Sequence, residues 1–413
     1  METLLRQQLA DFERIETRAD LDTLVQDLLG EKVLAFDTEA DSFYHYFDKT
    51  CLVAFDTEAD SFYHYFDKTC LVQIATRRQI YLVDPLAFGG PAELSPLAPI
   101  MASPDIRKIF HAAEYDIFVL KRDCAFEFRG LFDTMISAQL LGYSSVGLAG
   151  IAERHFGVNL PKDEQRSDWS RRPLTPKQLS YAASDVLYLI PLAEKLEKEL
   201  RAAKRLSWAQ EDFEALVERE WPDREFDKLG YLRIKGARKL DPKALAVLRE
   251  LFLMRDARAR EIDRPPFKVL GNRALLEISE NPPGKLDDLA KVKGISDLIL
   301  RRMGSELMAA VRAGKKKPHG PIPKLPGTSR RRMDRQAERR LAALKKWRSK
   351  RSADVEMDPG VLCPNSALEA IAWRAPETPT DLEGLSELKG WFVREFGAEV
   401  TEASLSADVP NKN

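Results

Sequence analysis

The chain has 413 residues, of which 44% are hydrophobic and 31% charged, a composition typical of a soluble globular protein of about three domains. No apolar run approaches the roughly 20 residues that span a bilayer, and the charged N-terminus does not resemble a signal peptide. Four scattered cysteines and five histidines argue against a disulfide framework or a zinc cluster. We therefore expect a cytoplasmic protein without a membrane partner.

The first 200 residues alternate strand-like and helix-like patterns. Strands are predicted at 32–40 (KVLAFDTEA), 69–76 (TCLVQIAT), 79–86 (QIYLVDPL) and 108–111 (KIFH). Helices are predicted at 21–30, 112–123, 132–143, 147–157 and 175–204, with Thr175 and Pro176 as the cap and first turn of the last. This order indicates a mixed α/β sheet with helices packed on its faces.

The strand pattern ends before residue 236, and two similar helical segments follow. Residues 236–314 form the first, and residues 333–406 repeat it weakly, so that NRALLEI in one corresponds to NSALEAI in the other. Residues 315–332 are rich in Pro, Gly, Lys and Arg and predict an extended linker.

The net charge of −1 hides an uneven distribution of charge. Residues 312–351 contain 16 Lys and Arg but only two acids, Asp334 and Glu338. A basic segment on an otherwise acidic chain favours a polyanionic partner, because contacts with phosphates release counterions. A solvated linker with a positive bias is the alternative.

Residues 35–53 and 54–72 are identical, AFDTEADSFYHYFDKTCLV in both copies. Each copy ends an apolar run with Asp-Thr-Glu, and strand alternation places the two acids on one face and the Thr on the other. The acids are Asp37 and Glu39 in the first copy, and Asp56 and Glu58 in the second. Alone, this pattern also fits a polar turn at a strand end.

Two further acidic positions lie on predicted helices. Asp116 is near the start of one, where it could simply complement the helix dipole. Tyr181 and Asp185 are four residues apart and therefore share a helix face, where a structural hydrogen bond would also explain them. Four carboxylates converging in a core are costly unless cations neutralise them. Hard oxygen ligands suit Mg²⁺ or Mn²⁺, and two such ions can bind the attacking and leaving oxygens of a phosphodiester.

The order Asp-Thr-Glu, KIFHAAEYD and YAASD resembles the DEDD exonucleases with Tyr in the third motif. The segment RSDWSRRPLTPKQLSYAASDVLYL is similar to the signature of the ribonuclease D family, with the resemblance covering about residues 12–210. The helical repeats resemble HRDC domains. The resemblance implies a ribonuclease H-like exonuclease domain at 1–215, HRDC-like domains at 236–314 and 333–406, and 3′→5′ trimming of RNA.

Carried onto this chain, the resemblance assigns two divalent metal ions to the acids of the first motif, Asp116 and Asp185. Tyr181 would orient and help activate the attacking water. Four other side chains could bind nucleic acid: Arg166, Arg171, Arg172 and Trp169. Equally, Trp169 could be a core residue with the arginines lying over it. His111 is expected to be a satisfied strand-end residue, and Asp133 to cap the following helix.

Only one copy of the first motif can complete the site, because Asp116, Tyr181 and Asp185 each occur once. The second copy is contiguous with the strand at 69–76, so a local hairpin favours Asp56 and Glu58, with Asp37 and Glu39 as the alternative. The expected substrates are transfer RNA precursors or other small RNAs with a free 3′ end, acted on by a monomer. A DNA 3′→5′ exonuclease, or a nucleic-acid-binding protein whose site the surplus strand has spoiled, are the competing functions.

Overall fold

The computed structural model describes residues 11–40, 65, 68–161, 163–165, 167–221, 226–317, 320 and 333–407. The N-terminal domain is built on a six-stranded mixed sheet with the order β1-β4-β3-β2-β5-β6. β3 is antiparallel to both β2 and β4, whereas β1 is parallel to β4 and β5 is parallel to β2 and β6. The strands are β1 (Glu13–Ile15), β2 (Val33–Ala40), β3 (Thr69–Ala75), β4 (Ile80–Val83), β5 (Arg107–Phe110) and β6 (Leu131–Asp133). The predicted mixed α/β sheet is confirmed.

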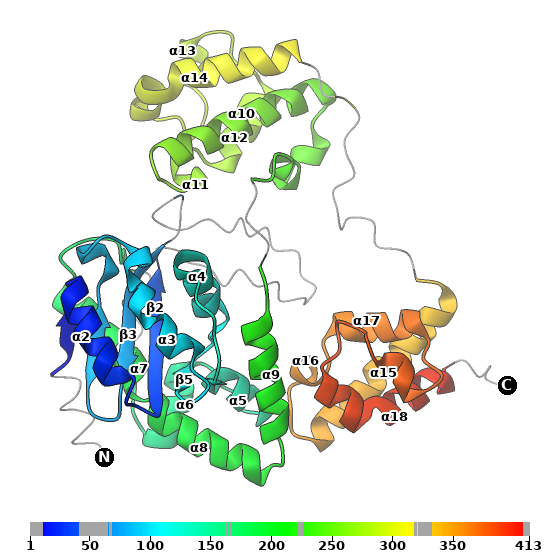
Figure 1. The fold of residues 1–413 in the computed structure, drawn as a ribbon. Helices are drawn as coiled ribbons and strands as arrows, with labels where there is room; N and C mark the ends of the chain where they lie inside the picture. The colour runs from blue at the N-terminus through cyan, green and yellow to red at the C-terminus, as the bar shows by residue number, and fades with distance from the viewer. Residues whose placement is uncertain are drawn as a thin grey trace.

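Helices cover both faces of this sheet (Figure 1). One buried cluster joins β2 and β3 to α2, α3 and α4, and another joins the opposite face to α7 and α8. The helices of this domain are α2 (Arg18–Leu28), α3 (Ala98–Ala102), α4 (Glu114–Cys124), α5 (Thr134–Leu140), α6 (Leu148–Phe156), α7 (Pro176–Leu187), α8 (Leu189–Ala202) and α9 (Leu206–Glu218). Short 3₁₀ turns lie at Pro85–Ala87 and Pro91–Leu97.

Local sequence explains where α7 begins and ends. Thr175 caps it in a reciprocal hydrogen-bonded box with Gln178, and Pro176 occupies the first turn, as predicted. The single helix predicted at 175–204 is instead two helices, α7 and α8, which meet at Tyr188. Pro191 has no backbone N–H to bond to the carbonyl of Leu187, so a continuous helix would lack a bond there.

Two strands were absent from the sequence prediction. β1 and β6 have only three residues each, too few to show a period of two. The helix predicted to begin at residue 132 begins at Thr134 instead, because Leu131–Asp133 is a strand that pairs with β5.

The first helical domain has a buried core of its own. It comprises α10 (Pro242–Glu261), α11 (Pro266–Val269), α12 (Asn272–Glu280), α13 (Leu286–Leu289) and α14 (Asp297–Lys316), preceded by 3₁₀ turns at Gly230–Arg233 and Ala237–Lys239. The long helices α10 and α14 lie side by side (Figure 1).

The second helical domain shares its core with the α/β domain. It comprises α15 (Arg335–Asp354), α16 (Pro359–Leu362), α17 (Asn365–Arg374), a 3₁₀ turn at Pro379–Leu382 and α18 (Gly390–Ser406). Trp208 of α9 stacks on Trp391 of α18 with ring centroids 4.6 Å apart and planes 8° apart. This domain therefore lies beside α9 (Figure 1).

Most of the predicted basic linker falls outside the described residues. Among the helices that the structure describes, none is both long enough and apolar enough to span a bilayer.

Candidate active site

The C-terminal half of β2 carries the first pair of acids. Val33–Ala40 alternates as the sequence predicts: Ala35 belongs to the buried cluster beneath α7, whereas Phe36 belongs to the cluster on the opposite face. Asp37 and Glu39 share the face of Ala35 because side chains two residues apart in a strand point the same way. The acids of the first copy therefore lie on the α7 side of the sheet.

Thr38, on the other face, connects β2 to α4. Its backbone N–H and its hydroxyl both donate to Oδ1 of Asp116, at 3.1 and 2.6 Å. Asp116 lies in the first turn of α4 and is buried. The two hydrogen bonds fix one carboxylate oxygen of Asp116 against the strand that carries the other acids. Sequence reasoning did not assign Thr38 a role, although its position between two acids was the available signal.

Helix α7 brings the third motif to the same place. Tyr181 and Asp185 lie one turn apart, and the Tyr181 hydroxyl donates a hydrogen bond to Asp185. The helix packs on β2, β3 and β4. Trp169 is buried behind Tyr181, with the two ring centroids 6.1 Å apart.

The carboxylates from these elements converge. Asp37, Glu39 and Asp185 each offer an oxygen within 4.8 Å of the others. Asp116 acts electrostatically on both Asp37 and Glu39, so it belongs to the same group. We call Asp37, Glu39, Asp116 and Asp185 the acidic cluster.

Burial and mutual repulsion change the ionisation of the acidic cluster. Burial is the main reason that the pKa values of Asp37 and Glu39 lie well above their usual range, and the neighbouring carboxylates raise them further. Burial also raises the pKa of Asp116 and of Asp185 to about 7, although hydrogen bonds from Thr38 and Tyr181 oppose the rise. The pKa of Tyr181 is raised too, chiefly by burial and then by Asp185, so its hydroxyl keeps its proton.

The acidic cluster fits a divalent cation. It consists of hard oxygen donors close together, and within the described residues none of the four acids forms an ion pair with Lys, Arg or His. A cation would stabilise the ionised carboxylates that burial and repulsion disfavour. Zinc is a poorer match, because these donors include neither Cys nor His.

The neighbouring His111 and Asp133 have structural contacts. Nδ1 of His111 lies 2.9 Å from the Thr134 hydroxyl, and burial lowers the pKa of His111 to about 4, so the ring is neutral near pH 7. Asp133 caps α5 as predicted by accepting hydrogen bonds from the backbone N–H groups of Met135 and Ile136.

The residues predicted to bind nucleic acid differ in their contacts and in their exposure to solvent. Arg172 pairs with Asp84 through two hydrogen bonds of 2.6 Å and also donates to the Cys70 carbonyl, so its guanidinium holds the fold together. Trp169 is only 1% exposed, which favours the core interpretation over stacking on a base. Arg171 is exposed, and Arg166 lies outside the described residues.

The duplicated motif is represented in the sheet by its first copy. β2 is Val33–Ala40, and it pairs with β3 so that Asp37 lies opposite Gln73. The local-hairpin argument, which favoured the second copy, did not anticipate this pairing. Loop length costs only about 0.6 kcal/mol per doubling, so a longer connection between β2 and β3 carries little penalty. Asp56 and Glu58 lie outside the described residues.

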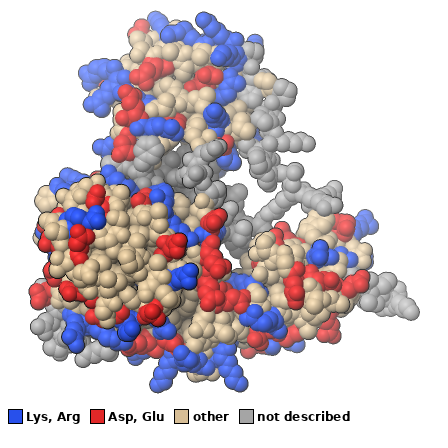
Figure 2. All heavy atoms as spheres, in the orientation of Figure 1, with Lys and Arg blue, Asp and Glu red and all other residues tan. Residues whose placement is uncertain are grey.

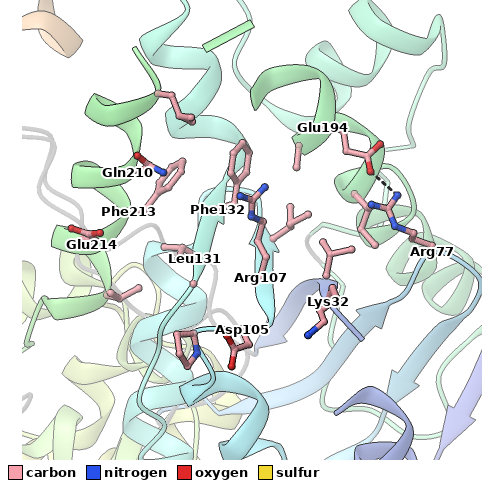
Figure 3. Close-up of a pocket in the computed structure, with 18 residues that line it drawn as sticks. Lys32, Arg77, Asp105, Arg107, Leu131, Phe132, Glu194, Gln210, Phe213 and Glu214 are labelled. Carbon is pink, nitrogen blue, oxygen red and sulfur yellow. Dashed lines mark ion pairs between the residues drawn. The ribbon is translucent and has the colours of Figure 1, made fainter. Parts of the chain in front are cut away.

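A cavity of about 550 Å³ lies at the other end of β2 (Figure 3). Its lining includes Lys32, just before β2, and Arg107, at the start of β5. Arg77 pairs with Glu194 at one edge of the cavity (Figure 3), and Arg107 pairs with Glu197. No residue of the acidic cluster lines this cavity, so it is not the candidate active site.

Comparisons with known proteins agree with this arrangement of domains. A family described as 3′-5′ exonuclease matches residues 47–201, and the HRDC domain family matches residues 244–311 and 337–403. The exonuclease match includes the second copy of the motif, whereas the structure places the first copy in the sheet. Because the copies are identical, a sequence match follows the copy that is contiguous with β3.

Two ribonuclease D proteins and one solved structure illustrate the similarity. The protein of Desulfotalea psychrophila is 30% identical over 86% of this chain and 89% of its own length. That of Xanthomonas oryzae is 37% identical over 52% of this chain and 59% of its own length. The crystal structure of Escherichia coli RNase D, described as an exoribonuclease involved in structured RNA processing, is 25% identical with a TM-score of 0.65, covering 95% of this chain and 99% of that one. The chain therefore belongs to the ribonuclease D family of 3′→5′ exoribonucleases, with an exonuclease domain followed by two HRDC domains.

Proposed function

We propose that the acidic cluster is the catalytic site for hydrolysis of the last phosphodiester at the 3′ end of an RNA. The observation that carries this proposal is a group of four carboxylates, one buried and three half-buried, without an ion-pair partner among the described residues. Such an arrangement is costly for folding alone, and it suits a site that takes up cations.

Asp37, Glu39 and Asp185 would hold the divalent ions, with Asp116 contributing the carboxylate oxygen that Thr38 leaves free. Bound Mg²⁺ or Mn²⁺ supplies Lewis acidity and lowers the pKa of bound water. In this proposal the ions number two, as the family resemblance implies.

Tyr181 would position the attacking water rather than remove its proton. Its hydroxyl keeps its own proton, since burial and the neighbouring carboxylates raise its pKa. A protonated phenol can donate to Asp185 and accept from a water molecule at the same time. Orientation of the water along the line of attack would then favour displacement of the 3′-terminal nucleotide.

The first HRDC domain offers a basic surface for the rest of the RNA. Lys and Arg side chains are numerous on the face of this domain that Figure 2 shows. Exposed basic residues of the domain include Arg260, Arg264, Lys268, Lys291 and Lys293. Contacts from such residues to phosphates would give affinity without sequence preference. Because the similar E. coli protein is described as acting on structured RNA, we propose transfer RNA precursors and other small structured RNAs as substrates.

The proposal includes a monomer acting in the cytoplasm. Cys124 and Cys363 form no disulfide with another described residue, as suits a reducing compartment. Sedimentation equilibrium with and without RNA would check the monomeric state.

The test is trimming of one RNA labelled at either its 3′ or its 5′ end, with Mg²⁺, Mn²⁺ or EDTA. The 3′ label should appear at once as mononucleotide, whereas the 5′ label should shorten one nucleotide at a time, and EDTA should stop both. A matched DNA strand in parallel measures the preference for RNA. Asp116→Asn serves as the inactive control, and undiminished trimming by this variant would contradict the proposal.

A further inference from the structure

The side chain of Gln73, in the middle of β3, is fully buried and unsatisfied. Its exposed fraction is 0%, and neither its amide nitrogen nor its amide oxygen has a hydrogen-bond partner within the described residues. A buried amide without partners destabilises a fold, and most buried polar groups in proteins are bonded. The position therefore needs an explanation other than stability.

The sheet register places Gln73 directly opposite Asp37. Side chains of directly opposed residues in an antiparallel pair lie on the same face, with Cβ atoms about 5 Å apart. Leu71 and Ala75, two residues either side of Gln73, belong to the same buried cluster as Ala35, two residues before Asp37. Gln73 and Asp37 therefore both project towards α7, which carries Tyr181 and Asp185.

The chemistry of the two side chains is complementary. The amide of Gln73 has two N–H donors, whereas a carboxylate that binds a cation through one lone pair still has others that accept hydrogen bonds. Protein groups that bond to a metal ligand orient it, and their loss commonly weakens metal binding. The other described side-chain donors near the acidic cluster serve different acids, since the Thr38 hydroxyl bonds to Asp116 and Tyr181 to Asp185, whereas Asp37 receives only the backbone N–H of Thr38.

We propose that Gln73 is a positioning residue, whose side-chain N–H donates to the Asp37 carboxylate when the acidic cluster holds a divalent ion. This inference rests on the proposed function, because it assigns Gln73 a task only in the ion-loaded state. Within the described residues the amide has no partner, and an Asp37 carboxylate held in place by an ion would supply it with a fixed acceptor. Gln73 thus lowers the stability of the ion-free fold and raises affinity for the ion.

The test uses Gln73→Met in the full chain, because Met has nearly the shape of Gln but cannot form these hydrogen bonds. Two quantities are measured: the Tm in EDTA, and the Kd for Mn²⁺ by isothermal titration calorimetry. We expect the Tm in EDTA to stay the same or to rise, and the Kd for Mn²⁺ to increase about 10-fold to 100-fold. Gln73→Glu, which keeps the shape but replaces the N–H donors with a carboxylate, should also weaken Mn²⁺ binding.

The matched control is Gln178→Met. Gln178 is also a buried glutamine, but its side-chain oxygen accepts hydrogen bonds from the backbone N–H and the hydroxyl of Thr175 at the start of α7. This substitution should lower the Tm in EDTA and leave the Kd for Mn²⁺ within about twofold, because only a side chain that bonds to a metal ligand orients that ligand.

Two results would overturn the inference. One is an unchanged Kd for Mn²⁺ in Gln73→Met, and the other is a Tm in EDTA that falls as far as that of Gln178→Met, which would show that the amide is already bonded in the ion-free protein. Failure of the proposed function would look different, because the wild-type protein itself would then bind no Mn²⁺.

Discussion

Carboxylates withdrawn from solvent occur both in the acidic cluster and at the contact between α9 and the second HRDC domain, but their surroundings differ. At the contact, Asp212 accepts hydrogen bonds from Lys389 and from the indole of Trp391, at 2.7 and 3.0 Å. Glu211 accepts from the Trp391 backbone and from Arg394, at 2.7 and 2.6 Å. In the acidic cluster the nearest charges are other carboxylates.

The difference separates carboxylates that stabilise the fold from carboxylates that await a ligand. An acid withdrawn from solvent with a cation and N–H donors contributes to folding, and here it fixes the second HRDC domain on α9. A group of such acids without cations costs stability when ionised, and this cost is offset when a ligand supplies positive charge or, at lower pH, when protons neutralise the acids. The two HRDC domains also differ in their packing. The second shares its hydrophobic core with the exonuclease domain, whereas the first has a core of its own.

The largest effect is expected for removal of an acid from the cluster. Asp37→Asn should reduce the rate of RNA trimming about 10³-fold or more, because loss of a metal-binding carboxylate removes several kcal/mol of transition-state stabilisation. Asp56→Asn, in the second copy of the motif, should retain the wild-type rate. Single-turnover trimming of 5′-labelled RNA measures the rates of both variants. A large fall in rate for Asp56→Asn alone would show that the second copy of the motif forms the site.

The next effect is a dependence of stability on pH that belongs to the acidic cluster. The pKa values of Asp116 and Asp185 are about 7 in the folded protein but near 4 in an unfolded chain. Between these values the folded state binds more protons, so the free energy of unfolding should fall as pH rises from about 4 to about 7. The Tm in EDTA should therefore be lower at pH 8 than at pH 5.5.

A saturating concentration of Mn²⁺ should raise the Tm most at pH 8 and so remove this dependence. Asp185→Asn should reduce the difference in Tm between the two pH values. A Tm in EDTA that rises from pH 5.5 to pH 8 would contradict the assignment of raised pKa values.

A smaller effect is expected at the contact between domains. Asp212→Asn replaces an acceptor that serves Lys389 and Trp391, and it should lower the free energy of unfolding by about 2 kcal/mol. Trimming activity well below the Tm should change less than about twofold. Urea unfolding at constant pH measures the first quantity, and a variant that is as stable as wild type would show that this contact does not hold the domain in place.

The smallest effect is expected for Thr38→Val, which keeps the shape of the side chain and removes one of two hydrogen bonds to Asp116. The backbone N–H still donates, so kcat should fall about tenfold rather than vanish. Thr23→Val, which removes an exposed hydroxyl bond within α2, is a suitable control. Equal kcat values for the two variants would mean that Thr38 does not position Asp116.

Much of this arrangement could be predicted from local sequence. The Asp-Thr-Glu alternation in β2, the cap at Thr175 and the one-turn spacing of Tyr181 and Asp185 are all properties of neighbouring residues. The DEDD-type order of the motifs then indicated that distant acids would meet.

The remaining features depend on contacts between distant residues. The choice of the first motif copy could not be read from two identical segments, and only the structure shows that the first copy pairs with β3. The three-residue strands β1 and β6 exist only because of their sheet neighbours. Burial of Trp169 and the stacking of Trp208 on Trp391 are likewise tertiary, and an isolated aromatic residue gives no signal for either.

The most direct test of the account is calorimetric titration of Mn²⁺ into wild-type protein, Asp185→Asn and Asp212→Asn. We predict that wild type and Asp212→Asn bind Mn²⁺ with Kd values within about twofold of each other, whereas Asp185→Asn binds at least about tenfold more weakly. Equal binding by all three proteins would contradict the claim that the unpaired carboxylates of the acidic cluster form the metal site.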